Sequence, residues 1–271
     1  MDATKILYIT QEIAPYLPES EIGNVCRSLP PAIHEKGKET RIFMPRYGCV
    51  NERRNQLHEV IRLSGMNIII DDSDHPLVIK VASIQSIRMQ VYFIDNEDFF
   101  QRKYMFGDEN GEYPDNEDRS IFFVRGVLET VKKLRWTPDI IHCHGWIAAL
   151  IPLYIKRAAS SDPFFKHSKV IYSLYGNDNE FKQPFSERFG EKIKVEGIGK
   201  EEVGSILNKT VSFADLSKIA VEYADAVIQG SENVDESVIE HIKKIGVPFL
   251  SYQSPENYLE EYNNFYDLVL K

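Results

Sequence analysis

The chain has 271 residues, of which 43% are hydrophobic and 27% are charged, a composition typical of a globular protein with a sizeable core. Its net charge of −9 argues against nucleic acid as a partner, because phosphate binding requires clustered lysine and arginine. No apolar run approaches the ~20 residues that a membrane helix needs, and the start lacks the apolar core of a signal peptide. The three cysteines have no metal-ligand spacing, so we expect free thiols in a cytoplasmic protein.

The first elements predict a βαβ unit. Residues 5–10 are an apolar run of strand length, which is typical of a parallel strand buried on both faces. Two prolines predict a loop over residues 11–20. A helix is predicted to begin at Ser20 or the next residue and to run to about Lys36. The second strand is predicted at residues 41–47.

The pattern changes after this unit. Residues 56–94 hold short β-branched runs divided by turn residues, which predicts antiparallel hairpins inserted into, or appended to, the parallel sheet. An aromatic-rich loop is predicted over residues 96–116. Asp115 or Asn116 is then predicted to cap a long helix that ends near Arg135.

Residues 139–154 predict a strand, a sharp corner and an apolar helix. The corner carries His142, His144 and Trp146. In open α/β sheets, ligands collect outside the carboxyl ends of the parallel strands, where helix amino termini point their amides outward. We therefore expect this corner, together with the loop at residues 11–22, to form the functional site.

The last hundred residues continue the alternation of strands and helices, which predicts an α/β fold. We expect one domain over residues 1–271, built as a doubly wound, Rossmann-like parallel sheet with an antiparallel hairpin insert. A terminal helix over residues 255–270 is predicted to pack back over the domain. The remaining predicted elements are a strand at 170–174, a polar corner at 175–181, a helical stretch at 200–223, a strand at 226–228, a helix from Ser231 to Lys244, a strand at 247–252 and a cap for the terminal helix at Ser254.

The two histidines of the corner have different interpretations. If the strand continues to His144, both side chains share one face, because strand side chains alternate. His142 is interpreted as a core histidine bonded to the backbone. His144 lies beside Gly145, where a ligand can approach closely, and imidazole can bond a sugar hydroxyl or a phosphoryl oxygen. A zinc site is disfavoured, because no third ligand has a convincing spacing.

Other candidate residues leave two interpretations open. Trp146 could stack on a sugar ring or anchor the core beneath the helix. Asp115 could grip sugar hydroxyls, or it could complement the dipole of the long helix. The helix start near Ser20 favours an anion, but Glu19 and Glu21 place like charge beside it. No glycine-rich nucleotide motif and no G-x-S-x-G motif occurs.

Six segments resemble, in order, the amino-terminal domain of bacterial glycogen and starch synthases, most closely the short Bacteroides-type version. The resemblance covers nearly the whole chain, and the combination of segments is specific. These segments are ILYITQEIAPY (6–16), LPPAIHEKGKETRIFMPRYG (29–48), VYFIDNEDFF (91–100), GEYPDNEDRSIFFVRGVLE (111–129), PDIIHCHGWIAALIPLYIK (138–156) and YADAVIQGSENV (223–234).

The resemblance implies the amino-terminal half of a GT-B glycosyltransferase. In such enzymes this half binds the growing α-1,4-glucan, while a carboxy-terminal domain, which residues 1–271 lack, binds most of the ADP-glucose. Transfer retains the anomeric configuration and needs no metal or other cofactor. The family's catalytic histidine falls on His144, and Gly145 replaces an aspartate.

The resemblance also places the family's donor-binding residues on this sequence. The Lys-X-Gly-Gly loop that meets the donor phosphates falls on residues 18–21, where Pro18 replaces the lysine, Ser20 and Glu21 replace the two glycines, and Glu19 adds a second carboxylate. The family's His-Asn corner falls near Tyr175 and lacks its histidine. Substrate contacts are accordingly expected at Glu19, Ser20, Glu21, Asp115, Gly145, Trp146 and Tyr175.

Three functions remain open at this point. The chain could be a glucosyltransferase domain that acts with a second protein supplying the missing half. It could instead be a non-catalytic module that binds α-glucan or a protein. A third possibility is a self-associating α/β protein with a different role.

Overall fold

The computed structural model of the chain describes residues 3–87, 89–176 and 179–271, and its main feature is a mixed, mostly parallel sheet. Residues 177–178 of the predicted polar corner lie outside the described residues. The spatial order of the strands is β12-β11-β10-β9-β1-β2-β6-β5-β3, and β4 pairs with β5. The strands are β1 (Lys5–Thr10), β2 (Glu39–Pro45), β3 (His58–Glu59), β4 (Met66–Ile70), β5 (Ser73–Ile84), β6 (Met89–Asp95), β9 (Ile140–His144), β10 (Lys169–Leu174), β11 (Ala226–Gln229) and β12 (Phe249–Leu250), with a separate hairpin of β7 (Gly107–Asp108) and β8 (Gly111–Glu112).

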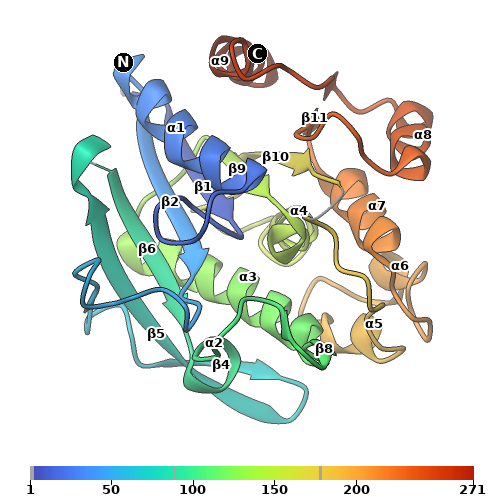
Figure 1. Ribbon diagram of the computed structural model, residues 1–271. Coiled ribbons are helices and arrows are strands. Elements are labelled where there is room, and N and C mark those ends of the chain that lie inside the picture. The colour runs from blue at the N-terminus through green and yellow to red at the C-terminus, as the bar shows by residue number, and fades with distance from the viewer. Residues whose placement is uncertain (1–2, 88, 177–178) are drawn as a thin grey trace.

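Helices cover both faces of the sheet, as a doubly wound fold requires. Figure 1 shows α1 and α9 on one side, and α3, α4 and α7 on the other. The helices are α1 (Glu21–Glu35), α2 (Glu97–Phe100), α3 (Asn116–Leu134), α4 (Ile151–Lys156), α5 (Phe189–Lys192), α6 (Lys200–Val203), α7 (Phe213–Tyr223), α8 (Glu236–Ile245) and α9 (Tyr258–Val269), with short 3₁₀ turns η1 (Gln85–Ile87) and η2 (Trp146–Ala148). Among the described residues, no helix combines the length and apolarity that crossing a bilayer requires.

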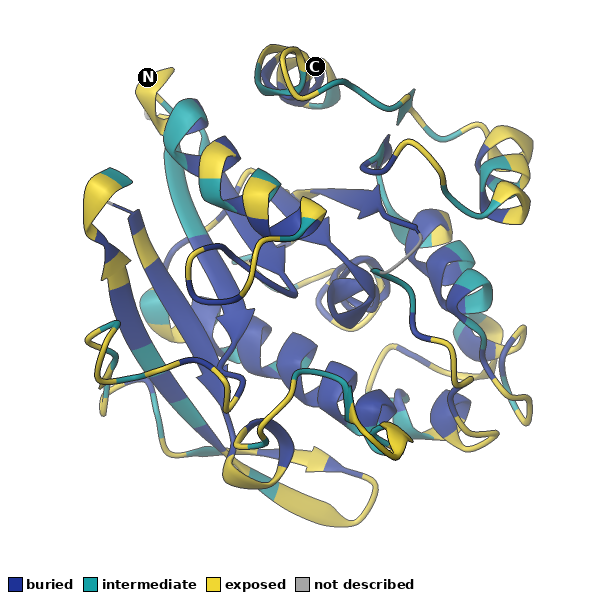
Figure 2. Ribbon diagram, viewed as in Figure 1, coloured by how far each residue is buried: buried dark blue, intermediate teal, exposed yellow. Residues whose placement is uncertain are grey.

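The strand that precedes the predicted corner lies in the middle of the sheet. β9 is parallel to β1 on one side and to β10 on the other, with Ile6 opposite Ile140 and Thr10 opposite His144. All five residues of β9 are buried, and Figure 2 shows this burial extending along the central strands. Each isoleucine buried here contributes about 1.5–3 kcal/mol. The predicted strand before the corner is therefore confirmed, and it is a central parallel strand of the sheet.

The amino-terminal prediction is also confirmed in detail. α1 begins at Glu21, and the Ser20 hydroxyl accepts a hydrogen bond from the Gly23 amide at 2.9 Å. This bond satisfies one of the amides that a helix start leaves unpaired. The capping serine thus fixes where the loop after β1 ends.

The hairpin insert is smaller than the sequence suggests. β3 and β4 pair antiparallel with β5, and β5 pairs antiparallel with β6, as expected. However, β6 is parallel to β2, with Ile42 opposite Val91, so it belongs to the parallel sheet. A short β-branched run looks the same in both settings, because periodicity does not report strand direction.

Three predictions in the last third are wrong. The helical stretch at 200–223 is divided into α6 and α7 by a turn in which Asn208 has a φ of 56°. Ser231 does not cap α8, which begins at Glu236 and is capped by Asp235. α9 begins at Tyr258, after a turn rather than a Ser254 cap. The expected packing of α9 is confirmed, because it contacts α1 and buries three aromatic rings, those of Tyr262, Phe265 and Tyr266.

Candidate functional site

The corner after β9 turns sharply at Gly145. This residue has a φ of 82° and a ψ of 168°, a conformation that is nearly exclusive to glycine. The chain then enters η2 at Trp146. The backbone amide of Gln11, just after β1, donates to the His144 carbonyl at 3.2 Å. The two predicted ligand loops are therefore held side by side at one edge of the sheet.

His142 and His144 share one face of β9, and their ring centroids lie 3.9 Å apart. Both side chains are fully buried. His142 is hydrogen bonded through Nδ1 to the Tyr266 hydroxyl and through Nε2 to the Ser173 hydroxyl, each at 2.7 Å. His144 is bonded through Nδ1 to the Tyr175 hydroxyl at 2.8 Å. His142 is thus a core histidine, as predicted, although its partners are side chains rather than backbone.

Burial holds both rings in the neutral form. It lowers the pKa of His144 from 6.5 to about 3. Burial, with a further contribution from the neighbouring His144, lowers the pKa of His142 well below 6.5. The Nε2 atom of His144 has no hydrogen-bond partner among the described residues. An unpaired buried nitrogen costs about 1–3 kcal/mol, so this ring is an unusual core element.

A pocket opens beside this cluster, at the carboxyl ends of β1, β9 and β10. Its cavity volume is about 320 Å³. Its lining combines carboxylates, side-chain amides and aromatic rings, and contains no lysine or arginine. The lining residues are Gln11, Glu12, Ser20, Met105, Phe106, Glu112, Trp146, Asn179, Glu180 and Phe181. We call this hollow the edge pocket.

One wall of the edge pocket is a small hydrogen-bond network around Glu12. The Gln11 Nε2 donates to Glu12 Oε1, and the Ser20 hydroxyl donates to Glu12 Oε2, each at 2.8 Å. Glu12 is only 5% exposed. Because the same serine caps α1, the network couples the helix start to the pocket wall.

Packed aromatic side chains also line the edge pocket. Trp146 lies 4.8 Å from Phe106 and 5.3 Å from Phe181 between ring centroids. With 2% of its surface exposed, Trp146 is mainly a core anchor that presents an edge to the pocket. Of the two interpretations for Trp146, its burial corresponds to the anchor.

Several predicted site residues lie away from the edge pocket. His144 and Tyr175 are bonded to each other inside the protein, and the Gly145 backbone packs against the Gln11 side chain. Glu19 is exposed, whereas the Glu21 carboxylate accepts a hydrogen bond from the Ser231 hydroxyl. Asp115 forms an ion pair with Arg102 and makes no side-chain cap on α3. Of the predicted residues, only Ser20 and Trp146 line the pocket.

The structure adds residues that the sequence reasoning missed. Gln11 and Glu12 follow β1 directly, so the rule that ligands gather at the carboxyl ends of strands could have identified them. Glu180 lies six residues after the end of β10, within the predicted polar corner at 175–181. No sequence pattern could have identified Glu112, because it reaches the pocket from the distant β7–β8 hairpin. Its carboxylate accepts hydrogen bonds from the backbone amides of Lys182 and Gln183.

Replacing Gly145 by alanine tests the corner. We expect Gly145→Ala to lower the free energy of unfolding by about 3 kcal/mol, because a Cβ would strain the backbone and lie 2.3 Å from Gln11 Oε1. Gly65→Ala is the matched control, since Gly65 has a φ of 84° but open space around it, and should cost about 1 kcal/mol. Urea unfolding measures both. Equal losses would mean that Gln11 does not constrain the corner.

Comparison with known proteins identifies relatives over most of the chain. Residues 5–247 match the family described as starch synthase catalytic domain. A glycogen synthase of Chlorobium limicola is 34% identical over 237 residues, covering 87% of this chain and 47% of the relative. A glycogen synthase of Chlorobium luteolum is 35% identical over 246 residues, covering 90% of this chain and 49% of the relative. The chain thus spans about half the length of the curated relatives it matches.

A solved structure supports the fold. The catalytic domain of Starch Synthase IV from Arabidopsis thaliana, bound to ADP and acarbose, aligns with a TM-score of 0.72 at 17% identity. The alignment covers 93% of this chain and 52% of that chain. At this identity the similarity establishes a common fold, which agrees with the GT-B amino-terminal half that the resemblance implies.

Proposed function

Because the chain belongs to the family of starch synthase catalytic domains, we propose that it is the acceptor-side half of a glucosyltransferase that extends an α-1,4-glucan. The observation that carries this proposal is the edge pocket at the carboxyl ends of β1, β9 and β10. That edge is where open α/β sheets bind their ligands. The proposed donor is ADP-glucose.

The chemistry of the edge pocket favours a neutral sugar chain. Aromatic faces such as those of Phe106 and Phe181 suit the apolar side of a pyranose ring. Carboxylates and amides, such as those of Glu180 and Asn179, bond sugar hydroxyls in both directions. The pocket volume is within the range of small-molecule sites. We therefore assign the pocket to the acceptor glucan.

The donor diphosphate requires groups from elsewhere. The pocket lining has no lysine or arginine to offset its charge. At the start of α1, the Gly23 amide is already bonded to Ser20, and Glu19 and Glu21 flank the site. We propose that a second half, from outside residues 1–271, binds most of ADP-glucose, either on a partner protein or on a longer chain.

The catalytic role expected for His144 is part of this proposal. His144 is the last residue of the central strand β9, and it is followed in the chain by Gly145 and Trp146. Because the ring is buried and neutral, it would act as a hydrogen-bonding group rather than a charged acid. Contact with the donor sugar requires that the cluster around it open when the second half docks.

Binding of an unphosphorylated glucan tests the acceptor assignment. We expect maltoheptaose to bind the chain in calorimetry, and Glu180→Gln to weaken it about fivefold, because a charged hydrogen bond becomes a neutral one. Glu261→Gln, which removes the same charge from the exposed surface of α9, is the control. No binding, or equal weakening by both variants, would contradict the assignment.

Transfer activity tests the rest of the proposal. Radiolabelled glucose should pass from ADP-glucose to glycogen when the chain is mixed with the carboxy-terminal half of a related glycogen synthase. The chain alone should give no transfer. Transfer that persists undiminished in His144→Gln would remove the proposed role of that residue.

A further inference from the structure

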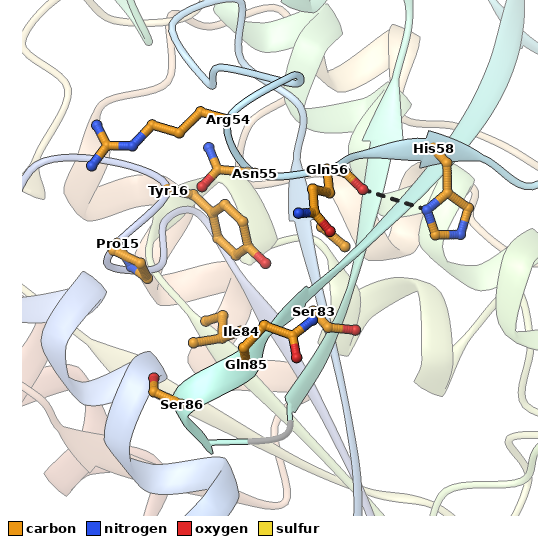
Figure 3. A pocket seen from close by; sticks show the side chains of 11 residues that line it. Pro15, Tyr16, Arg54, Asn55, Gln56, His58, Ser83, Ile84, Gln85 and Ser86 are labelled. Carbon is orange, nitrogen blue, oxygen red and sulfur yellow. Dashed lines mark hydrogen bonds between the residues drawn. The ribbon is translucent and has the colours of Figure 1, made fainter.

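A second hollow lies between the turn at residues 51–58 and the end of β5, and Figure 3 shows it from close by. Its cavity volume is about 430 Å³. None of its lining residues is an aspartate or glutamate, although the chain carries a net charge of −9. The lining residues are Pro15, Tyr16, Arg54, Asn55, Gln56, His58, Ala82, Ser83, Ile84, Gln85 and Ser86. We call this hollow the turn pocket.

The turn that forms one wall is held in a fixed shape. Asn51 organises it, because its side-chain oxygen accepts from the Arg54 amide and its carbonyl accepts from the Asn55 side chain, each at 2.8 Å. Gln56 adopts a left-handed conformation with a φ of 55°. That conformation costs about 1–2 kcal/mol for a residue other than glycine. The side chains that face the hollow are thus presented by an ordered backbone.

The Tyr16 hydroxyl at this hollow is buried, and no described residue bonds it. Tyr16 is 6% exposed, its ring meets Phe93 edge-on at 5.0 Å, and its hydroxyl has no hydrogen-bond partner among the described residues. Figure 3 shows its hydroxyl directed toward the space between the turn and the end of β5. A buried hydroxyl without a partner costs about 1–3 kcal/mol, and a ligand that reached this oxygen would offset that cost.

The charge around the turn pocket favours an anion. Arg54 lines the hollow, and its extended side chain has no ion pair or hydrogen bond among the described residues. Glu52, in the same turn, is engaged by Arg46 at 2.9 Å and by Lys80 at 2.7 Å. Glu59 follows His58 but does not line the hollow. Guanidinium groups bind phosphates through paired hydrogen bonds.

We propose that the turn pocket binds a small phosphorylated sugar, with the phosphate at Arg54. The sugar hydroxyls then bond the side-chain amides of Asn55, Gln56 and Gln85 and the Tyr16 hydroxyl. The volume exceeds the needs of a bare phosphate, and the donors are spread along the hollow rather than gathered at one point. Nothing in this assignment depends on glucan transfer at the edge pocket.

Calorimetric titration of the whole chain with glucose 1-phosphate tests the proposal. We expect millimolar binding that Arg54→Gln weakens at least fivefold. Tyr16→Phe keeps the contact with Phe93 and should weaken binding at least threefold. Arg53→Gln is the matched control, because Arg53 is an exposed neighbour that does not line the hollow, and it should change binding less than twofold.

Two further probes separate the sources of affinity. Inorganic phosphate alone and glucose alone should each bind at least fivefold more weakly than glucose 1-phosphate. Equal binding of inorganic phosphate, or equal weakening by Arg53→Gln and Arg54→Gln, would overturn the proposal. Either result would mean that unspecific attraction between charges accounts for the binding. Equal binding of glucose, or no binding of any probe at 20-fold molar excess over ~1 mM chain, would overturn it as well.

Discussion

Tyr266→Ala is expected to lower the free energy of unfolding by about 5 kcal/mol. Tyr266 is fully buried on α9, its ring packs against His142, and its hydroxyl bonds His142 Nδ1 at 2.7 Å. Truncating a buried aromatic ring costs about 3–5 kcal/mol. The variant would also leave a histidine nitrogen buried and unpaired, at a further ~1–3 kcal/mol.

Matched variants divide this loss into its parts. Tyr266→Phe keeps the ring and removes only the hydroxyl, so it should cost about 1–2 kcal/mol. Leu268→Ala lies on the same helix but is 58% exposed, so it should cost under about 0.5 kcal/mol. Urea unfolding followed by circular dichroism measures all three. If Tyr266→Ala costs no more than Leu268→Ala, α9 does not hold the histidine cluster closed.

The importance of Tyr266 follows from how α9 is attached. Its ion pairs with the turn after α1, from Lys36 to Glu260 and from Lys38 to Asp267, have partly exposed partners. Such pairs are worth at most about 1 kcal/mol each. The buried rings of Tyr262, Phe265 and Tyr266 therefore supply most of the attachment.

Acidification is expected to destabilise the chain by about 4 kcal/mol between pH 7.5 and pH 5 through the buried histidines. Each folded-state pKa is lower than the unfolded value of 6.5, so the unfolded chain binds more protons as the pH falls. The contribution is fully present above pH 6.5 and is lost progressively on the way to about pH 3, the folded pKa of His144. Each ring accounts for about 2 kcal/mol at pH 5.

A measurement on the rings themselves isolates this effect from the titration of carboxylates. In NMR titrations, the ring resonances of His142 and His144 should not titrate before the chain unfolds. A ring resonance of His144 that titrates near pH 6.5 in the folded chain would contradict the expected burial.

The sequence by itself determined the features that depend on spacing along the chain. Apolar runs of strand length identified β1, β9 and β10. Ser20 marked the start of α1, because a capping bond joins residues only three apart. The alternation of strand side chains put His142 and His144 on one face. The resemblance to the synthase family agreed with this pattern and with the fold.

The tertiary structure alone decided what depends on distant partners. The direction of β6 is set by its pairing with β2, and the Asp115 carboxylate pairs with Arg102 rather than capping α3. His144 is hydrogen bonded to Tyr175, which is 31 residues away along the chain. Its neighbour His142 is bonded to Tyr266 of α9, which is 124 residues away. The edge pocket likewise joins loops from four parts of the chain. Local periodicity carries no information about such contacts, because they form only when the whole sheet and its covering helices are assembled.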